Sequence, residues 1–195
     1  MRKGKPRAKV SLGLDLSLTH TGYCVIEEGG KVLRSGVIKS KPNGDRPTDE
    51  LERLMGIINE IRRIVLLGDF YPEVAVIENL AFSVRNSTSL TVLAGLSYMV
   101  RQEIFASLFF PFYLVAPTSL KKYITGKGIG EKDHMMMAIF KDYGFEASDN
   151  NEADAFGLAA IGLSVLGHPI KKETIPQKEV INLLMKQTWT KKPEK

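Results

Sequence analysis

The run from Val10 to Asp15 is apolar until its last residue, and it constrains the fold more than any other stretch of the chain. A buried strand can end on a carboxylate only where hydrogen bonds, an opposite charge or a metal ion offset the loss of hydration. Small polar residues follow, and a second apolar run begins at Tyr23. We therefore expect a strand, a tight turn and a second strand, with Asp15 directed into a cleft. From this stretch alone, a carboxylate that only caps the turn is an equal alternative.

The other elements predict an α/β fold on a mixed five-stranded sheet, with three antiparallel strands followed by two parallel ones. Hydrophobic runs bounded by turn residues predict strands at 10–16, 22–27, 31–39, 74–78 and 112–115. Helical spacing predicts helices at 47–67, 88–108, 131–143 and 150–166, with a short helix or turn at 117–123. We expect Thr48 to cap the first helix and Gly68 to end it.

The chain is expected to have three parts. Residues 1–8 form a basic flexible arm, residues 9–168 form one domain, and residues 169–195 form a polar extension with a short helix over 178–186. We recognise no signal peptide or membrane span and expect a cytoplasmic protein, in a bacterial or virus-infected cell.

Two further acids resemble Asp15 in their setting. Glu78 ends the apolar strand 74–78, and Asp154 lies one turn inside an otherwise apolar helix, three residues after Asn151. Parallel neighbouring strands would place Asp15 and Glu78 side by side at the edge where such sheets bind ligands. Three converging carboxylates repel one another without a cation, and they suit Mg²⁺ or Mn²⁺. Two such ions would activate a water and stabilise the leaving oxygen of a phosphoryl displacement.

Charge and composition indicate the class of partner. The formal net charge is +5 and the pI is about 9.2, which favours a polyanion. The single cysteine, Cys24, lies in an apolar strand and excludes a disulfide framework. No histidine has an evident partner, and the glycines at 126, 128 and 130 do not form a P-loop. We therefore expect neither a Ser-His-Asp site nor a nucleotide cofactor.

These motifs, taken in order over residues 8–167, resemble the RuvC family of Holliday-junction resolvases. The matching segments are Leu12-Gly13-Leu14-Asp15, Thr21-Gly22-Tyr23, Val76-Ile77-Glu78, Phe82, residues 126–132 and Asn151-Glu152-Ala153-Asp154. The resemblance implies a ribonuclease-H-like fold. It also implies a homodimer that makes paired symmetric nicks in four-way DNA junctions during recombination or repair, using Mg²⁺.

The resemblance assigns metal binding to Asp15, Glu78 and Asp154, and it aligns Asn151 with a fourth position that is usually Asp or His. An amide oxygen can coordinate a cation but brings neither charge nor a proton acceptor. The second ion would then bind more weakly, or Asp149 or Glu152 would substitute. From their spacing alone, Asp149 and Glu152 are better interpreted as an N-cap residue and its N3 partner.

The resemblance also matches Lys132 and Lys121 to catalytic basic residues, and Phe82 to an aromatic near the junction centre. The residue types are consistent with this, because a lysine beside a scissile phosphate stabilises developing charge. Phosphate contacts are expected from Lys121, Lys122, Lys127 and Lys132, and backbone contacts from Arg85 and Asn86. Phe82 would stack on an unpaired base or pack on its own domain. The helix at 88–108 would serve the core alone or also a two-fold interface.

Two other interpretations stay open. One is a nuclease of the same superfamily that acts on branched DNA generally or on RNA–DNA hybrids. The other is a non-catalytic junction-binding protein, which the neutral Asn151 would permit. Cleavage of a four-way junction, a fork and a hybrid duplex in Mg²⁺ or Mn²⁺ separates them.

Overall fold

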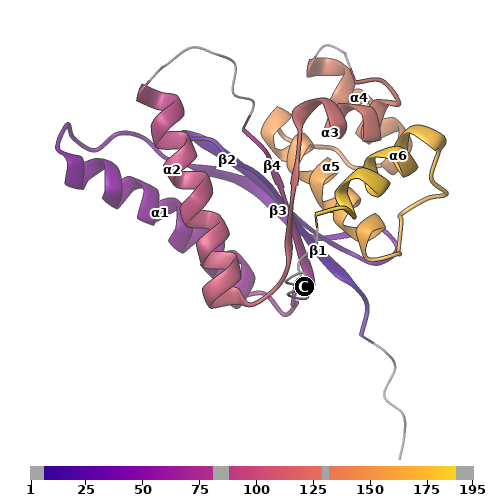
Figure 1. The fold of residues 1–195 in the computed structure, drawn as a ribbon, viewed down its shortest axis with the longest axis horizontal. Helices are drawn as coiled ribbons and strands as arrows, with labels where there is room; N and C mark the ends of the chain where they lie inside the picture. The colour runs from indigo at the N-terminus through magenta and orange to yellow at the C-terminus, as the bar shows by residue number, and fades with distance from the viewer. Residues whose placement is uncertain (1–6, 81–87, 129–131, 188–195) are drawn as a thin grey trace, which may run out of the picture.

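The computed structural model describes residues 7–80, 88–128 and 132–187, which are arranged around one mixed sheet (Figure 1). The elements are β1 (Val10–Asp15), β2 (His20–Glu27), β3 (Lys31–Lys39), α1 (Pro47–Leu66), β4 (Val74–Glu78), α2 (Thr88–Glu103), a π-helical turn η1 (Ile104–Leu108), β5 (Phe112–Val115), α3 (Pro117–Thr125), α4 (Lys132–Tyr143), α5 (Asn150–Val165) and α6 (Ile175–Leu184). No helix of the described residues is both long enough and apolar enough to cross a bilayer.

The strand order is β3-β2-β1-β4-β5. β1 pairs with β2 and β2 with β3 in the antiparallel sense, whereas the β1–β4 and β4–β5 pairs are parallel. This confirms the predicted sheet. Leu14 lies opposite Ile77 across the β1–β4 pair, so the next residue of each strand, Asp15 and Glu78, leaves the sheet at the same edge.

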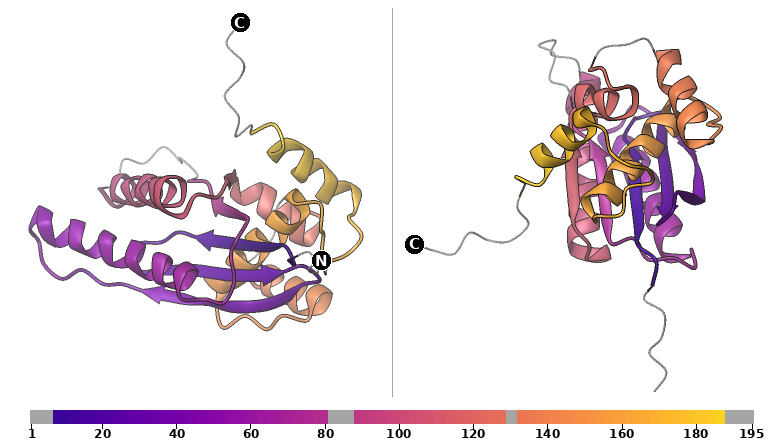
Figure 2. Two further views of the ribbon diagram at one scale, coloured as in Figure 1. Left: turned by 90° about the horizontal axis from the view of Figure 1, so that it is seen from below. Right: turned by 90° about the vertical axis from the view of Figure 1, so that its right-hand side faces the viewer.

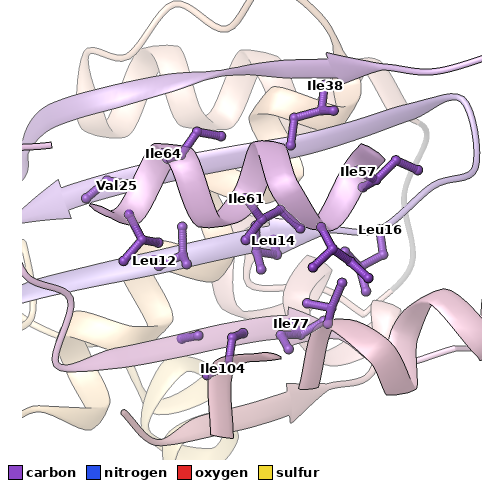
Figure 3. Packing of buried hydrophobic residues seen from close by; sticks show 14 of the residues in the cluster. Leu12, Leu14, Leu16, Val25, Ile38, Ile57, Ile61, Ile64, Ile77 and Ile104 are labelled. Atoms are coloured by element: carbon purple, nitrogen blue, oxygen red, sulfur yellow. The ribbon is translucent and has the colours of Figure 1, made fainter. Parts of the chain in front are cut away.

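Two helical layers cover the sheet. α1 and α2 lie on one face, and α3 to α6 lie on the other, with α6 (yellow) at the outer side of its layer (Figures 1 and 2). Leu12 and Leu14 of β1 point toward the isoleucines of α1 (Figure 3). Both faces of β1 are therefore covered, which explains why all six of its residues are buried. Cys24 of β2 is buried in the core between the sheet and the second layer.

Most helix ends lie within one or two residues of the prediction, and three differences are larger or change the cap. α1 begins at Pro47 with Arg46, not Thr48, as its N-cap residue, because the Asp49 carboxylate accepts the Arg46 backbone N–H at 3.1 Å. The long helix predicted at 88–108 is α-helical only as far as Glu103, and the turn from Ile104 to Leu108 is π-helical. α6 begins at Ile175 instead of residue 178, because Gln177 Oε1 accepts the Thr174 backbone N–H at 2.9 Å and starts the helix earlier.

One histidine has a partner that the sequence did not reveal. His168 Nδ1 lies 2.7 Å from the Glu28 carboxylate, 140 residues away in sequence. The contact joins the β2–β3 turn to the segment that follows α5. It is remote from the edge where Asp15 lies, because Glu27 of β2 pairs with Val10 at the other end of β1.

Candidate active site

Asp15 and Glu78 meet at the carboxyl edge of the sheet. Asp15 is 8% exposed and lies opposite Gly22 of β2. A hydrogen bond joins the Asp15 and Glu78 side chains. Burial raises the pKa of Glu78, and the charge of Asp154 raises it further, whereas the Asp15 hydrogen bond and the Lys121 charge oppose the shift. A raised carboxyl pKa beside other acids is typical of groups assembled for binding or catalysis.

Two glycines bring α5 close to this edge. A Cβ atom on Gly13 would lie 2.0 Å from the Ala155 backbone oxygen, and one on Gly22 would lie 2.0 Å from the Asn151 backbone oxygen. Only glycine lets the α5 backbone lie this near to β1 and β2. Because Gly22 is opposite Asp15, the first turn of α5 is held directly beside the acid of β1.

The residues at the start of α5 have two different roles: some stabilise the start of the helix, and others face the site. The Asp149 carboxylate accepts the Glu152 backbone N–H at 2.9 Å, and the Glu152 carboxylate accepts the Ser148 backbone N–H at 2.7 Å. Burial alone would raise the pKa of Glu152, but hydrogen bonds from Ser148 and Ser35 lower it overall. Both carboxylates are thus engaged at the helix start. Asn151 donates its amide to Asp149 at 3.5 Å, which leaves the amide oxygen for other contacts.

One pocket of about 310 Å³ brings together five of the residues selected from the sequence. Its lining consists of Asp15, Glu78, Pro117, Lys121, Met135, Asn150, Asn151 and Asp154. Asp149 and Glu152 do not line it. The other three members, Pro117, Met135 and Asn150, were not predicted from the sequence. Pro117 and Met135 carry no chemical signal, and Asn150 was hidden by its more conspicuous neighbour Asn151.

The predicted DNA contacts have varied positions. The Lys122 ammonium pairs with Glu179 of α6 at 2.5 Å, so part of its charge is already compensated. Lys127 lines a different pocket, beside α4. Lys132 is the first residue of α4, but its side chain lies outside the described part of the structure. Phe82, Arg85 and Asn86 also lie outside the described residues.

The donor set of the pocket is made of oxygen atoms. Three carboxylates and an amide carbonyl are the ligand types that hard divalent cations prefer. Across residues 7–80, 88–128 and 132–187, however, no group of three His, Cys, Asp or Glu side chains is already gathered into a metal-binding arrangement. The chemistry of the donors fits a metal, and the metal site itself stays a prediction.

Comparison with known proteins identifies the family. Residues 11–162 match the family model described as crossover junction endodeoxyribonuclease RuvC. The chain belongs to the RuvC family. A RuvC of Synechococcus sp. strain WH7803 is 29% identical over 156 residues, which cover 77% of this chain and 96% of that protein. A RuvC of Rickettsia bellii is 28% identical over 155 residues, with 77% and 94% coverage.

Solved RuvC structures share the fold. The Thermus thermophilus RuvC structure matches with a TM-score of 0.64 at 22% identity, covering 82% of this chain and 97% of that one. The same protein in complex with a Holliday junction substrate also matches with a TM-score of 0.64, at 19% identity. RuvC membership confirms the predicted fold and the predicted class of activity, a crossover junction endodeoxyribonuclease. The matched segment contains the whole pocket and ends before α6.

Proposed function

We propose that this RuvC protein resolves four-way DNA junctions and that Asp15, Glu78 and Asp154, with Asn151, bind the Mg²⁺ ions that cleavage requires. One observation carries the proposal: two strand ends and one helix deliver these four oxygen-bearing side chains to a single pocket. At this edge of the sheet, neutral residues would serve a purely structural role better than a cluster of acids. The cluster therefore indicates a binding or catalytic role.

The metal chemistry follows from the donors. Asp15 and Glu78 share a hydrogen bond, and burial together with the nearby charge of Asp154 raises the pKa of Glu78. Carboxyl groups gathered in this way favour a divalent cation, whose charge would offset their mutual repulsion. When bound, Mg²⁺ or Mn²⁺ supplies the Lewis acid that activates water and stabilises the leaving oxygen. Asp15, Glu78 and Asp154 would hold the metal through charged oxygens, and the neutral Asn151 would contribute a weaker, uncharged donor.

Lys121 is the basic residue of the pocket. It lies on α3, and its positive charge lowers the pKa of Glu78. An ammonium group here can approach the phosphate under attack and stabilise its extra negative charge. Lys132 begins the helix whose Met135 lines the same pocket, which supports a second basic contribution from that helix.

A homodimer is supported by the exposed surface of α2, η1 and the following residue. Tyr98 of α2, Phe105 of η1 and Phe109, which follows η1, are 68%, 61% and 81% exposed, and Gly95 of α2 has nothing within 4 Å of a Cβ position. Exposed aromatics around an open glycine suit close contact with another helix. A second copy of this chain is the partner that a two-fold-symmetric junction requires for two matched cuts.

The interface can be tested by sedimentation. The parent protein is expected to sediment as a dimer, and Tyr98→Asp combined with Phe109→Asp as a monomer that no longer makes paired nicks. Leu66→Asp is the matched control, because Leu66 is 62% exposed on α1 and should leave the dimer intact. A double variant that remains dimeric would rule out this face.

Cleavage of a labelled four-way junction tests the function. Asp15→Asn, Glu78→Gln and Asp154→Asn are each expected to abolish cutting in Mg²⁺ while the junction is still bound. Asn151→Asp should lower the Mg²⁺ concentration needed for half-maximal cleavage, because it adds a charged oxygen donor. Cutting confined to the RNA strand of a hybrid, or no cutting in either Mg²⁺ or Mn²⁺, would refute the proposal. The cytoplasmic location and the roles of Phe82, Arg85 and Asn86 stay predictions.

A further inference from the structure

A second pocket lies between the end of α3 and one face of α4. Its volume is about 340 Å³, and it is separate from the acidic pocket in all of its lining residues. The lining consists of Ile124, Thr125 and Lys127 on one side and His134, Ala138, Lys141 and Asp142 on the other. The four α4 residues have the spacing of a single helix face.

The charge of this pocket is positive. Lys127, His134 and Lys141 are exposed, and within the described residues neither lysine forms an ion pair. Asp142 is the one acid of the lining, and its carboxylate is compensated by Lys171 at 3.3 Å. Among the described residues, two ammonium groups without an ion pair and an imidazole therefore line a concave site that can accept an anion.

The position of Lys127 is built into a turn. Thr125 Oγ1 lies 2.8 Å from the Lys121 carbonyl and accepts the Lys127 backbone N–H at 3.2 Å. Gly126 has a φ of 75°, in the left-handed region that favours glycine. The turn ends α3 and fixes the backbone from which the Lys127 side chain extends, so less entropy is lost on binding.

α3 connects this pocket to the acidic one. Pro117 and Lys121 line the acidic pocket, whereas Ile124 and Thr125 line the basic one. Pro117 and Thr125 are the two ends of α3, about 12 Å apart at 1.5 Å per residue. That length corresponds to roughly three to four nucleotides of a DNA strand at 3.4 Å each.

We propose that the basic pocket binds one backbone phosphate of the DNA, about three to four nucleotides from the scissile phosphate, with Lys127 and Lys141 on the same phosphodiester. This inference rests on the proposed function, because it takes the acidic pocket as the place of cleavage. A flanking phosphate held here would set the register of the strand across the carboxylates, and His134 would add a hydrogen bond at the pocket mouth.

Salt-dependent binding tests the pocket. Junction affinity is measured between about 50 and 200 mM salt, a range in which the release of counterions has a large effect on binding. The proteins compared are the parent, Lys127→Ala, Lys141→Ala and the double variant. Divalent metal is left out so that the junction stays uncut. Because both lysines share one phosphate, the double variant should lower the slope of log K against log salt by about 0.9, not by twice that value. Lys31→Ala is the matched control, since Lys31 lies at the other end of the sheet. A double variant that behaves like Lys31→Ala overturns the proposal.

A backbone scan then locates the phosphate. Methylphosphonates, which remove the charge of one phosphate, are placed singly along the cut strand. At one position the parent should lose affinity while the double variant does not, because its lysines are already absent. If the parent cuts the unmodified junction but no such position exists, only this inference fails. If the parent neither binds nor cuts four-way junctions, the proposed function and this inference fail together.

Discussion

Gly22→Ala should damage catalysis far more than DNA binding. The added Cβ would lie 2.0 Å from the Asn151 backbone oxygen and 2.4 Å from its carbonyl carbon. No side-chain rotation can relieve a contact with backbone, so the first turn of α5 must retreat by about 1 Å to reach even 3.0 Å. The retreat carries Asn151 and Asp154 away from Asp15, which lies opposite Gly22 in the sheet.

The expected magnitudes follow from overpacking and misplacement. Overfilling a well-packed core typically costs about 1–3 kcal/mol of unfolding free energy. For a chain of this size each kcal/mol lowers Tm by roughly 2–4 °C, so the variant should still be folded at 25 °C. A displacement of about 1 Å in a catalytic group can reduce the rate about 100-fold. The proposed phosphate contacts of Lys121 and of the basic pocket do not lie on α5, so junction affinity without divalent metal should stay within about threefold of the parent.

The assay combines single-turnover cleavage of a labelled four-way junction, anisotropy binding and thermal melting by circular dichroism. Gly56→Ala is the matched control, because a Cβ at this exposed position of α1 meets nothing within 4 Å. It should cleave normally and gain about 0.5–1 kcal/mol of stability from the better helix former. If Gly22→Ala cuts at the parental rate with an unchanged Tm, the argument for close α5 packing is wrong.

Three further predictions concern stability and the identity of the site residues. Arg62→Ala should destabilise the fold clearly more than Arg63→Ala, because it removes two 2.7 Å hydrogen bonds from the Glu103 carboxylate, whereas Arg63 pairs with Glu60 on the exposed side of α1 and its loss should change stability by less than about 0.5 kcal/mol. Arg62 holds the pKa of Glu103 below its ordinary value, so this stabilisation is present above that value and is lost as pH falls through the lowered one; a denaturation series from pH 7 to pH 3 checks both. Asp149→Ala should cost about 0.5–2 kcal/mol of stability, as an N-cap residue does, and still cleave junctions in Mg²⁺; loss of cleavage at unchanged stability would make it a ligand instead. Gln187→Ala removes the side-chain amide that pairs with the backbone N–H and carbonyl of Leu114 in edge strand β5 at 3.0 and 2.8 Å, so hydrogen exchange of the Leu114 amide should quicken; unchanged exchange would contradict this.

Local sequence patterns were enough to predict the strands and helices and to place two acids of the site, Asp15 and Glu78, next to each other. Alternating burial, turn residues and helical spacing depend on nearby residues only, so β1, β4 and their terminal acids could be placed before any tertiary information. The same holds for Asp149 and Glu152, whose spacing already indicated a helix start. The remaining acid, Asp154, was grouped with the other two because it lies on an otherwise apolar helix. Only the tertiary structure shows that it reaches their pocket, because it is more than 70 residues away from both in sequence.

The features that depend on contacts between distant parts of the chain became visible only in the tertiary structure. The pairing of Lys122 with Glu179 and of His168 with Glu28 joins segments 57 and 140 residues apart, which no local pattern encodes. The basic pocket likewise exists only because α3 and α4 pack together. The sequence by itself determined that a buried strand ends on Asp15. Only the fold decided which residues lie beside that carboxylate. Gly13 and Gly22 have no side chains, so α5, which lies more than 120 residues further along the chain, can pack against β1 and β2 next to Asp15.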